Sequence, residues 1–195
     1  YLKTNITEKS PKICDKLEVQ NFLSSLPFEL TKDQMSAVTE IYNDMTSEKR
    51  MNRLICGDVG SGKTIVGVIA VYISYLSNYQ SALLAPTEIL AKQHYENITK
   101  LFSGTNLKTA LLLGSTKKKE KESILRDLSS GKIDLLIGTH AMLNEKVNFK
   151  NLGLVITDEQ HRFGVNQRES LRNKGLLPDI LYMSATPIPR TYALT

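Results

Sequence analysis

The chain has 195 residues, of which 41% are hydrophobic, and a formal net charge of +5 at pH 7. A chain of this length can bury enough apolar surface to fold as one domain without covalent cross-links, and its basic charge alone does not separate a nucleic-acid-binding protein from an ordinary enzyme.

The two cysteines, Cys14 and Cys56, lie too far apart in the sequence to indicate a disulfide framework. Because Cys56 follows apolar residues, we expect it to be a buried thiol in a reducing compartment. The longest apolar stretch, 65–76, is too short to span a bilayer, so we expect a soluble cytoplasmic protein that has no membrane partner.

Residues 1–25 are scattered polar groups with at most one short helix, over 15–23, and we interpret them as a linker or the end of a preceding domain. Residues 31–47 place apolar side chains at helical spacing behind Thr31, the expected N-cap. Apolar runs typical of strands then alternate with amphipathic helical segments, and this pattern predicts an α/β domain with a mostly parallel sheet and helices on both faces. The expected strands are 53–56, 82–85, 109–113, 135–138, 154–157 and 180–183.

A glycine-rich sequence, GDVGSGKT, follows the first expected strand and precedes an apolar helical segment. Its glycines allow close backbone approach to a polyphosphate, and the amides at the start of the following helix can bind phosphate oxygens. The lysine supplies a charge for the β- and γ-phosphates, and the threonine supplies a hydroxyl ligand for Mg²⁺. A glycine-rich turn with a solvated lysine would not explain the whole spacing. The predicted nucleotide-binding residues are Gly57, Gly60, Ser61, Gly62, Lys63 and Thr64.

Two adjacent carboxylates, Asp158 and Glu159, follow the fifth expected strand. Neighbouring residues of a strand point to opposite sides, so the two acids can have different roles. Asp158 is a candidate ligand of Mg²⁺, and Glu159 is a candidate base that orients and deprotonates an attacking water. A simple charge pair at a helix start is the alternative explanation.

Five sequences together resemble the RecG family of branched-DNA helicases in superfamily 2: GDVGSGKT, APTEILAKQHYE, GTHAML, DEQHRFGVNQR and SATPIPRT. The resemblance covers roughly residues 26–195, and it departs from the family pattern at Cys56 and Thr157. It implies a RecA-like domain, ATP and Mg²⁺ as cofactors, and an ATP-dependent helicase or translocase that remodels stalled forks and Holliday junctions in recombination and repair. The related transcription-repair coupling factor, which has a similar lobe, is an alternative.

The same resemblance implies an adenine-binding segment in LPFELTKDQ, with Phe28 packing on the base and Gln34 bonding to its edge. Thr31 and Gln34 also fit a T-x-x-Q capping box, so both roles of the glutamine stay open. In the sequence DEQH at 158–161, the resemblance implies that His161 acts at the γ-phosphate as a further catalytic residue. The residues implied to couple ATP to DNA are Gln160, Phe163, Ser184 and Thr186.

Three loops are implied to contact the backbone of a DNA strand, as helix N-termini and loop amides often do. A simple N-cap is the alternative role of the threonine in the first loop. The predicted DNA-binding residues are Thr87, Glu88, Gly114, Ser115, Thr139 and His140. The lysines at 117–119 begin a helix, where cations oppose the helix dipole; a solvated face and contact with DNA both explain them.

Residues 26–195 are therefore the expected N-terminal RecA-like, ATP-binding lobe, and residues 1–25 the linker or the end of a wedge-side domain. Superfamily 2 motors bind ATP between two such lobes, and the second lobe supplies arginines for phosphoryl transfer. The implied partners are branched DNA and the second lobe and wedge domain of the same protein. We expect weak or no turnover from this chain alone, for which a non-catalytic nucleotide- or DNA-binding module is an alternative. A GTPase is excluded because Asn173 and Lys174 are not followed by the required aspartate.

Overall fold

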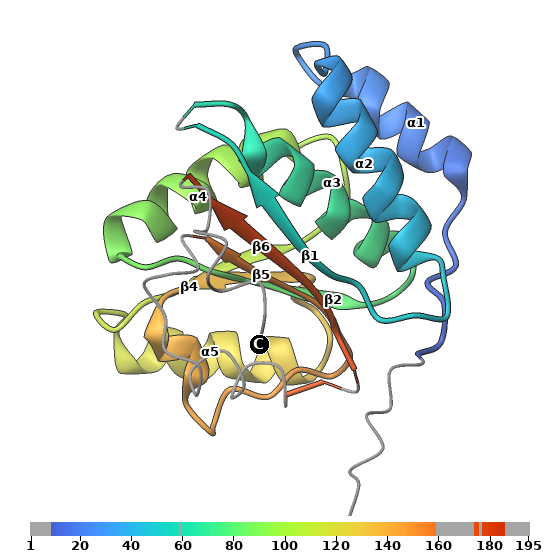
Figure 1. Cartoon of the computed structure of the whole chain (residues 1–195). Helices are drawn as coiled ribbons and strands as arrows, with labels where there is room; N and C mark the ends of the chain where they lie inside the picture. Colours follow the sequence, from blue (N-terminus) through green and yellow to red (C-terminus); the bar gives the residue numbers. More distant parts are fainter. Residues whose placement is uncertain (1–8, 59, 159–173, 176, 186–195) are drawn as a thin grey trace, which may run out of the picture.

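The structure is a computed structural model that describes residues 9–58, 60–158, 174–175 and 177–185 (Figure 1). The helices are α1 (Lys16–Ser25), α2 (Lys32–Met45), α3 (Lys63–Leu76), α4 (Glu88–Leu101) and α5 (Lys118–Ser129), with a short 3₁₀ helix, η1, at His140–Leu143. The strands are β1 (Asn52–Cys56), β2 (Gln80–Leu84), β3 (Thr109–Leu112), β4 (Leu135–Gly138), β5 (Leu152–Asp158) and β6 (Asp179–Ser184). Each expected strand is therefore present, and no strand end differs from its expected position by more than two residues.

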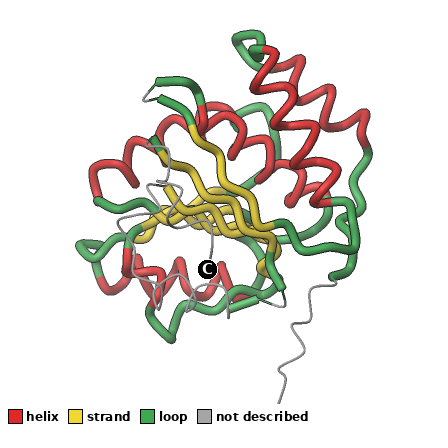
Figure 2. The backbone as a smooth tube through the Cα atoms, in the orientation of Figure 1, coloured by secondary structure: helices red, strands yellow, loops and turns green. Residues whose placement is uncertain are grey.

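The strands form one six-stranded sheet in the order β1-β6-β5-β2-β4-β3, and every neighbouring pair is parallel (Figure 2). All strand C-termini consequently lie at one edge of the sheet, where open α/β sheets bind their ligands. The predicted fold class is confirmed, and the sheet is parallel throughout.

Helices cover both faces of this sheet, with α5 on the face opposite α1, α2, α3 and α4 (Figure 1). Alternate strand residues point to opposite faces, so successive side chains of β2 enter different cores. Leu83 belongs to the core beneath α3, while Ala82 and Leu84 belong to the core that includes Leu128 of α5.

Helix α3 lies deepest in the structure, because residues 65–74 are all buried. A Cβ atom at Gly67 would lie 3.5 Å from both Ile156 of β5 and Met183 of β6, so the helix packs closely over these two strands. This packing fixes the start of α3, which carries the glycine-rich loop, at the C-terminal edge of the sheet. Among the described residues, none of the helices has both the length and the apolar character needed to cross a bilayer.

The expectation that Cys56 is buried is wrong, since its side chain is exposed. It lies in β1, an edge strand of the sheet whose residues are only partly covered. Cys14 is half-buried, and burial raises the pKa of its thiol. Both thiols are free.

The described part of residues 1–25 packs on the lobe. Val19 and Phe22 of α1 are buried in the main core, and the ring of Phe22 stacks on Tyr72 of α3 at 4.2 Å and on Phe102 at 5.5 Å between centroids. Helix α1 follows an Asp15 N-cap close to the expected start. The division of the chain at residue 25 into two domains stays a prediction.

Candidate functional site

The glycine-rich loop joins β1 to α3, as its sequence predicts. Gly60 and Gly62 have φ values of 87° and 76°, in the left-handed region that favours glycine. A Cβ atom at Gly57 would lie 2.7 Å from the hydroxyl of Ser61, so a side chain there would force the Ser61 side chain to move. Gly62 is the N-cap of α3 and provides no side-chain cap, which leaves the first amides of the helix suited to an anionic ligand.

The ammonium group of Lys63 lies on this loop. It donates hydrogen bonds to the carbonyl oxygens of Gly57 at 2.6 Å and Asp58 at 2.7 Å. These contacts hold the positive charge beside the amides at the start of α3, where phosphate oxygens can replace the carbonyls as acceptors. Thr64 follows in the first turn of α3.

Asp158 is brought to the same edge of the sheet by the strand register. Cys56 at the end of β1 pairs with Ser184 of β6, and Asp158 at the end of β5 pairs with Met183 of β6. The amide of Gly57 also donates to the carbonyl oxygen of Ser184 at 3.2 Å. The phosphate loop after β1, Ser184 at the end of β6 and Asp158 at the end of β5 therefore lie at the ends of three adjacent strands. The other predicted residues of this group, Glu159, Gln160, His161, Phe163 and Thr186, lie outside the described residues.

The donors present fit Mg²⁺ bound together with a nucleotide. Mg²⁺ commonly binds through one or two protein oxygens plus phosphates and waters, rather than in an all-protein cage. The described residues contain no cluster of three or more metal-ligating side chains, but Thr64 lies in the first turn of α3 and Asp158 ends β5, both at the sheet edge that carries the phosphate loop. A hydroxyl and a carboxylate fit a magnesium ion that also binds phosphates and waters, and the assignment of Thr64 and Asp158 as its ligands stays a prediction.

The sequence analysis missed His94, which contacts Asp158. The Nε2 atom of His94 lies 2.7 Å from Oδ2 of Asp158, and the two side chains are only 12% and 14% exposed. A single histidine inside an amphipathic helix does not identify a partner that lies far away in the sequence. The available signal is its spacing of three residues from Ala91 and four from Ile98, both buried, which places it on the inner face of α4.

The side chain of Gln34 joins α2 to the phosphate loop. Its Oε1 accepts from the amide of Thr31 at 2.9 Å, and the Thr31 hydroxyl accepts from the amide of Gln34 at 3.2 Å, which confirms the capping box. Its Nε2 donates to the carbonyl oxygen of Ser61 at 3.0 Å. The glutamine thus lies at the expected nucleotide site, while its bond to adenine stays a prediction.

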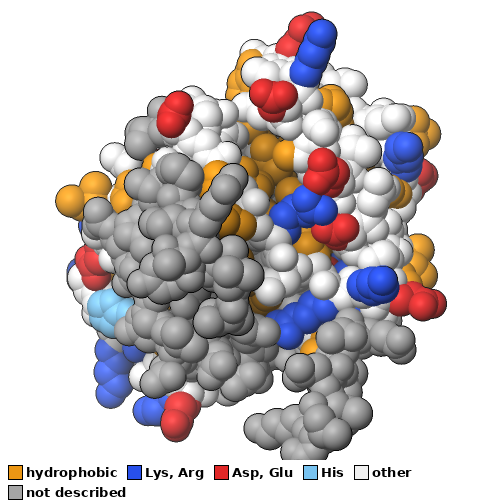
Figure 3. All heavy atoms as spheres, viewed as in Figure 1, with side chains coloured by type: hydrophobic (Ala, Val, Ile, Leu, Met, Phe, Trp, Pro, Cys, Tyr) orange, Lys and Arg blue, Asp and Glu red, His pale blue; other side chains and the backbone are white. Residues whose placement is uncertain are grey.

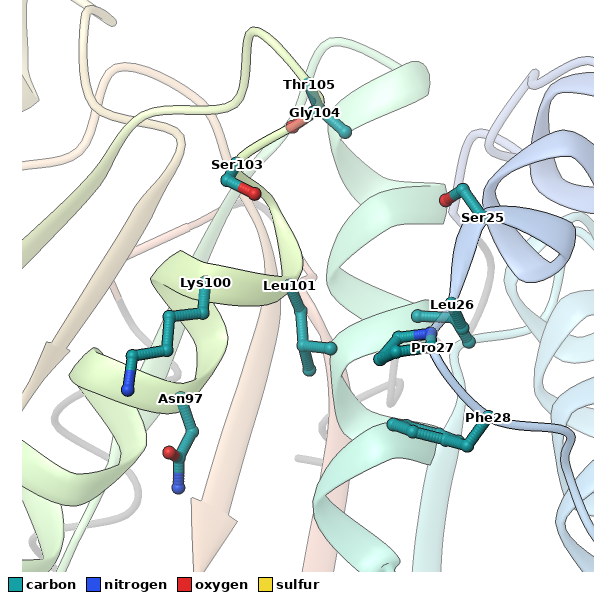
Figure 4. A pocket seen from close by; sticks show the side chains of 10 residues that line it. All are labelled: Ser25, Leu26, Pro27, Phe28, Asn97, Lys100, Leu101, Ser103, Gly104 and Thr105. Carbon is teal, nitrogen blue, oxygen red and sulfur yellow. The ribbon is translucent and has the colours of Figure 1, made fainter.

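The other predicted adenine contact, Phe28, is 47% exposed and borders an open pocket of about 620 Å³. Figure 4 shows its ring facing Asn97 of α4 across this pocket, with Pro27 and Leu101 further along it. An exposed ring beside a pocket is available for packing against a planar ligand. Its role in adenine binding stays a prediction.

The structure brings the three predicted DNA-contact loops together. Ser115 donates from its amide to Oε1 of Glu88 at 3.0 Å and from its hydroxyl to Oε2 at 2.7 Å. These bonds to the hydroxyl and the amide lower the pKa of Glu88. A Cβ atom at Gly114 would lie 3.3 Å from Glu88 and 3.8 Å from the ring of His140. The loops after β2, β3 and β4 therefore form one surface.

Two further residues of these loops differ in their environment. Thr87 is the N-cap of α4, because its hydroxyl accepts from the amide of Leu90 at 3.2 Å. Thr139 is 2% exposed, and its hydroxyl has no hydrogen-bond partner among the described residues. Thr87 thus has the structural role that its sequence position predicts, and contact of either residue with DNA stays a prediction.

Charge is not segregated on the face drawn in Figure 3, where Lys and Arg side chains lie among Asp and Glu side chains over the helices. Opposite charges also pair between α2 and β1, where Arg53 contacts Asp44 at 2.8 Å and Glu40. The net positive charge therefore does not by itself mark a nucleic-acid surface.

Comparisons with known proteins identify the family. Residues 31–194 match the DEAD/DEAH box helicase family. The chain is 56% identical over 178 residues to the ATP-dependent DNA helicase RecG of Bacillus subtilis, a match that covers 91% of this chain and 26% of that protein. It is 55% identical over 190 residues to the ATP-dependent DNA helicase RecG of Thermotoga maritima, covering 96% and 24% respectively.

Among solved structures, the chain is similar to RecG bound to a three-way DNA junction, with a TM-score of 0.84 and 52% sequence identity over 96% of this chain and 25% of that one. The chain thus spans about a quarter of the length of the curated relatives it matches. The phosphate loop and Asp158 lie within the matched range. The chain belongs to the DEAD/DEAH box helicase family, and its sequence and fold match the first RecA-like lobe of RecG helicases.

Proposed function

We propose that this chain is the nucleotide-binding first lobe of an ATP-dependent DNA helicase or translocase that remodels branched DNA, such as stalled forks and Holliday junctions, in the cytoplasm. The observation that carries the proposal is the convergence of the phosphate loop and Asp158 at the ends of three adjacent strands. The same strand edge continues into the surface formed by Glu88 and Ser115. Similarity to a RecG structure bound to a three-way junction supports branched DNA as the substrate class.

In this proposal the loop residues bind the nucleotide and the acidic residues prepare water for attack. Lys63 exchanges its carbonyl contacts for oxygens of the β- and γ-phosphates, and the first amides of α3 bind the same group. Thr64 and Asp158 hold Mg²⁺, which when bound neutralises phosphate charge. Glu159 orients and deprotonates the attacking water, as expected for a carboxylate beside the metal ligand.

The remaining proposed roles link this reaction to other parts of the protein. His161 and Gln160 couple the presence of the γ-phosphate to Ser184 and Thr186. Phe163 couples the binding of DNA to the ATP site. A second RecA-like lobe supplies an arginine that stabilises the transferring phosphoryl group, a contribution on the order of 10³ to 10⁵ in rate in related hydrolases. Without that arginine we expect slow turnover, or none, from this lobe alone. In the full-length protein, we expect a wedge domain to bind the branch point of the DNA.

Nucleotide binding by this chain tests the first part of the proposal. A fluorescent ATP analogue should bind to the unaltered chain, and Lys63→Ala should weaken binding by roughly 10- to 100-fold, because a charged hydrogen bond contributes about 1.5–3 kcal/mol. Lys132→Ala is the matched control, since this lysine is 75% exposed and outside the loop. Equal affinity in the two variants would contradict the assignment of the phosphate loop.

The DNA part of the proposal is tested in the full-length protein. A three-way junction should stimulate ATP hydrolysis, and Glu159→Gln should abolish the stimulated rate while leaving nucleotide binding intact. A rate of ATP hydrolysis that is the same with and without DNA would contradict the helicase assignment. It would leave the assignment of the nucleotide site intact.

A further inference from the structure

We propose that His94 is a positioning residue that fixes the Asp158 carboxylate for Mg²⁺ and thereby ties helix α4 to the nucleotide site. This inference rests on the proposed function, because it takes Asp158 as the metal ligand. The proposal adds that His94, two turns into α4, couples the position of this helix to the orientation of Asp158. The surface at the start of α4 is thereby connected to the magnesium site.

The contact between the two side chains is short and shielded from water. His94 Nε2 lies 2.7 Å from Oδ2 of Asp158, with 12% and 14% of the side chains exposed. A carboxylate only accepts hydrogen bonds, so the imidazole donates through Nε2–H. Bonds to an ionised acceptor are shorter and stronger than neutral ones, and low exposure strengthens them further. Asp158 has a second oxygen, and a carboxylate offers about four lone-pair sites, so a metal ion can bind while His94 stays in place.

Helix α4 holds His94 rigidly against the sheet. Ala91 and Ile98, three residues before and four after it, are 0% and 1% exposed in the main core. This spacing puts the three side chains on one helix face, where an apolar residue would be the default. A polar ring at such a position costs free energy unless it is hydrogen-bonded, and Asp158 supplies its partner.

The first turn of the same helix belongs to the surface of predicted DNA contacts. Thr87 caps α4, and Glu88 holds the amide and the hydroxyl of Ser115. A displacement of this turn by a bound strand would move the whole helix, because α4 is a single segment of 14 residues packed on the sheet. His94 would then shift with it, and the orientation of Asp158 would change.

Groups that hydrogen-bond a metal ligand typically change metal affinity or activity 10- to 100-fold when they are replaced. The first test is therefore a Mg²⁺ titration of fluorescent-ATP binding to this chain. His94→Asn should raise the apparent Kd for Mg²⁺ roughly tenfold or more, since its amide is too short to reach the Nε2 position. His94→Gln places an amide donor near that position and should restore most of the affinity. Gln93→Ala, an exposed neighbour on the same helix, should behave as the unaltered chain.

Nucleotide binding in excess chelator separates positioning from folding. Because the proposed role concerns the metal ligand, all variants should bind nucleotide equally without Mg²⁺. Equal Mg²⁺ dependence of the Asn and Gln variants and the unaltered chain would overturn the proposal. Loss of metal-free binding together with Mg²⁺ dependence would assign His94 to packing and would also overturn it. Failure of the unaltered chain to bind ATP would instead refute the proposed function.

The link through α4 has its own readout in the full-length protein. If DNA and Mg²⁺·ATP binding are coupled, each changes the affinity of the other by the same factor. A three-way junction should change the apparent Kd for Mg²⁺, and this change should shrink in His94→Asn and persist in His94→Gln. A junction effect of the same size in His94→Asn as in the unaltered protein would overturn the link.

Discussion

The ammonium nitrogen of Lys12 lies 2.6 Å from Oδ2 of Asp179, and Nζ of Lys9 lies at the same distance from the same oxygen. None of the three side chains is more than 5% exposed. The other carboxylate oxygen accepts from the amide of Met51 at 2.8 Å, and Lys12 also donates to the carbonyl of Gly153. The segment before α1 is thereby fastened to the start of β6, at the sheet edge opposite the phosphate loop.

Removing this carboxylate should destabilise the protein strongly. We expect Asp179→Ala to lower the free energy of unfolding by about 3–5 kcal/mol, because it leaves buried ammonium groups without a counter-charge. Urea denaturation measures the change. Asp127→Ala is the matched control, since its pair with Lys132 at 3.7 Å is largely exposed and should contribute at most about 1 kcal/mol. Similar losses in both variants would show that the Asp179 cluster is solvated in solution.

Gln34 has two separable contacts, which two substitutions distinguish. Gln34→Glu keeps an acceptor for the Thr31 amide and removes the donor to Ser61, whereas Gln34→Ala removes both groups. We expect both variants to lose preference for ATP over GTP, and only the alanine variant to lose roughly 1 kcal/mol of stability with the hydrogen bond from the Thr31 amide. Competition binding and urea denaturation provide the two measurements. An unchanged base preference in both would reject the adenine role.

Glu88 should titrate below its ordinary value of 4.5, because the Ser115 hydroxyl and amide favour the ionised carboxylate. A carboxylate with a lowered folded-state pKa contributes stability that is present above pH 4.5 and is lost as the pH falls through that lowered value. NMR titration should therefore show a low pKa that moves upward in Ser115→Ala. An ordinary pKa in both proteins would mean that the contact between the loops does not persist in solution.

The three lysines at 117–119 are exposed at the start of α5, directly after Ser115 and Thr116. If they bind phosphates, replacing all three by alanine should reduce the slope of log K for DNA binding against log salt by about 0.7–0.9 for each phosphate that a lysine had neutralised. Binding titrations of the full-length protein at several salt concentrations measure this slope. Replacement of Lys16 and Lys49, exposed lysines outside the predicted contact loops, should leave it unchanged. The same slope in both variants would identify the run as a solvated face.

Local sequence determined the strands, the phosphate loop and the helix caps of this protein. Apolar runs that alternate with amphipathic segments predict a parallel sheet, because only burial on both faces tolerates such strands. The loop at 57–64 and the caps at Thr31 and Thr87 depend on conformations and hydrogen bonds within a few residues. Their physical causes lie close together along the chain, so the residue types predict them.

Tertiary structure decided the contacts whose partners lie far apart in the sequence. Cys56 is exposed because β1 lies at the edge of the sheet, and strand order is not encoded in the strand's own residues. His94 meets Asp158 across 64 residues, and Lys12 meets Asp179 across 167. Each such pairing depends on how the helices pack on the sheet and on which strands become neighbours. A single side chain carries no signal of that distant partner, so only the folded arrangement could reveal it.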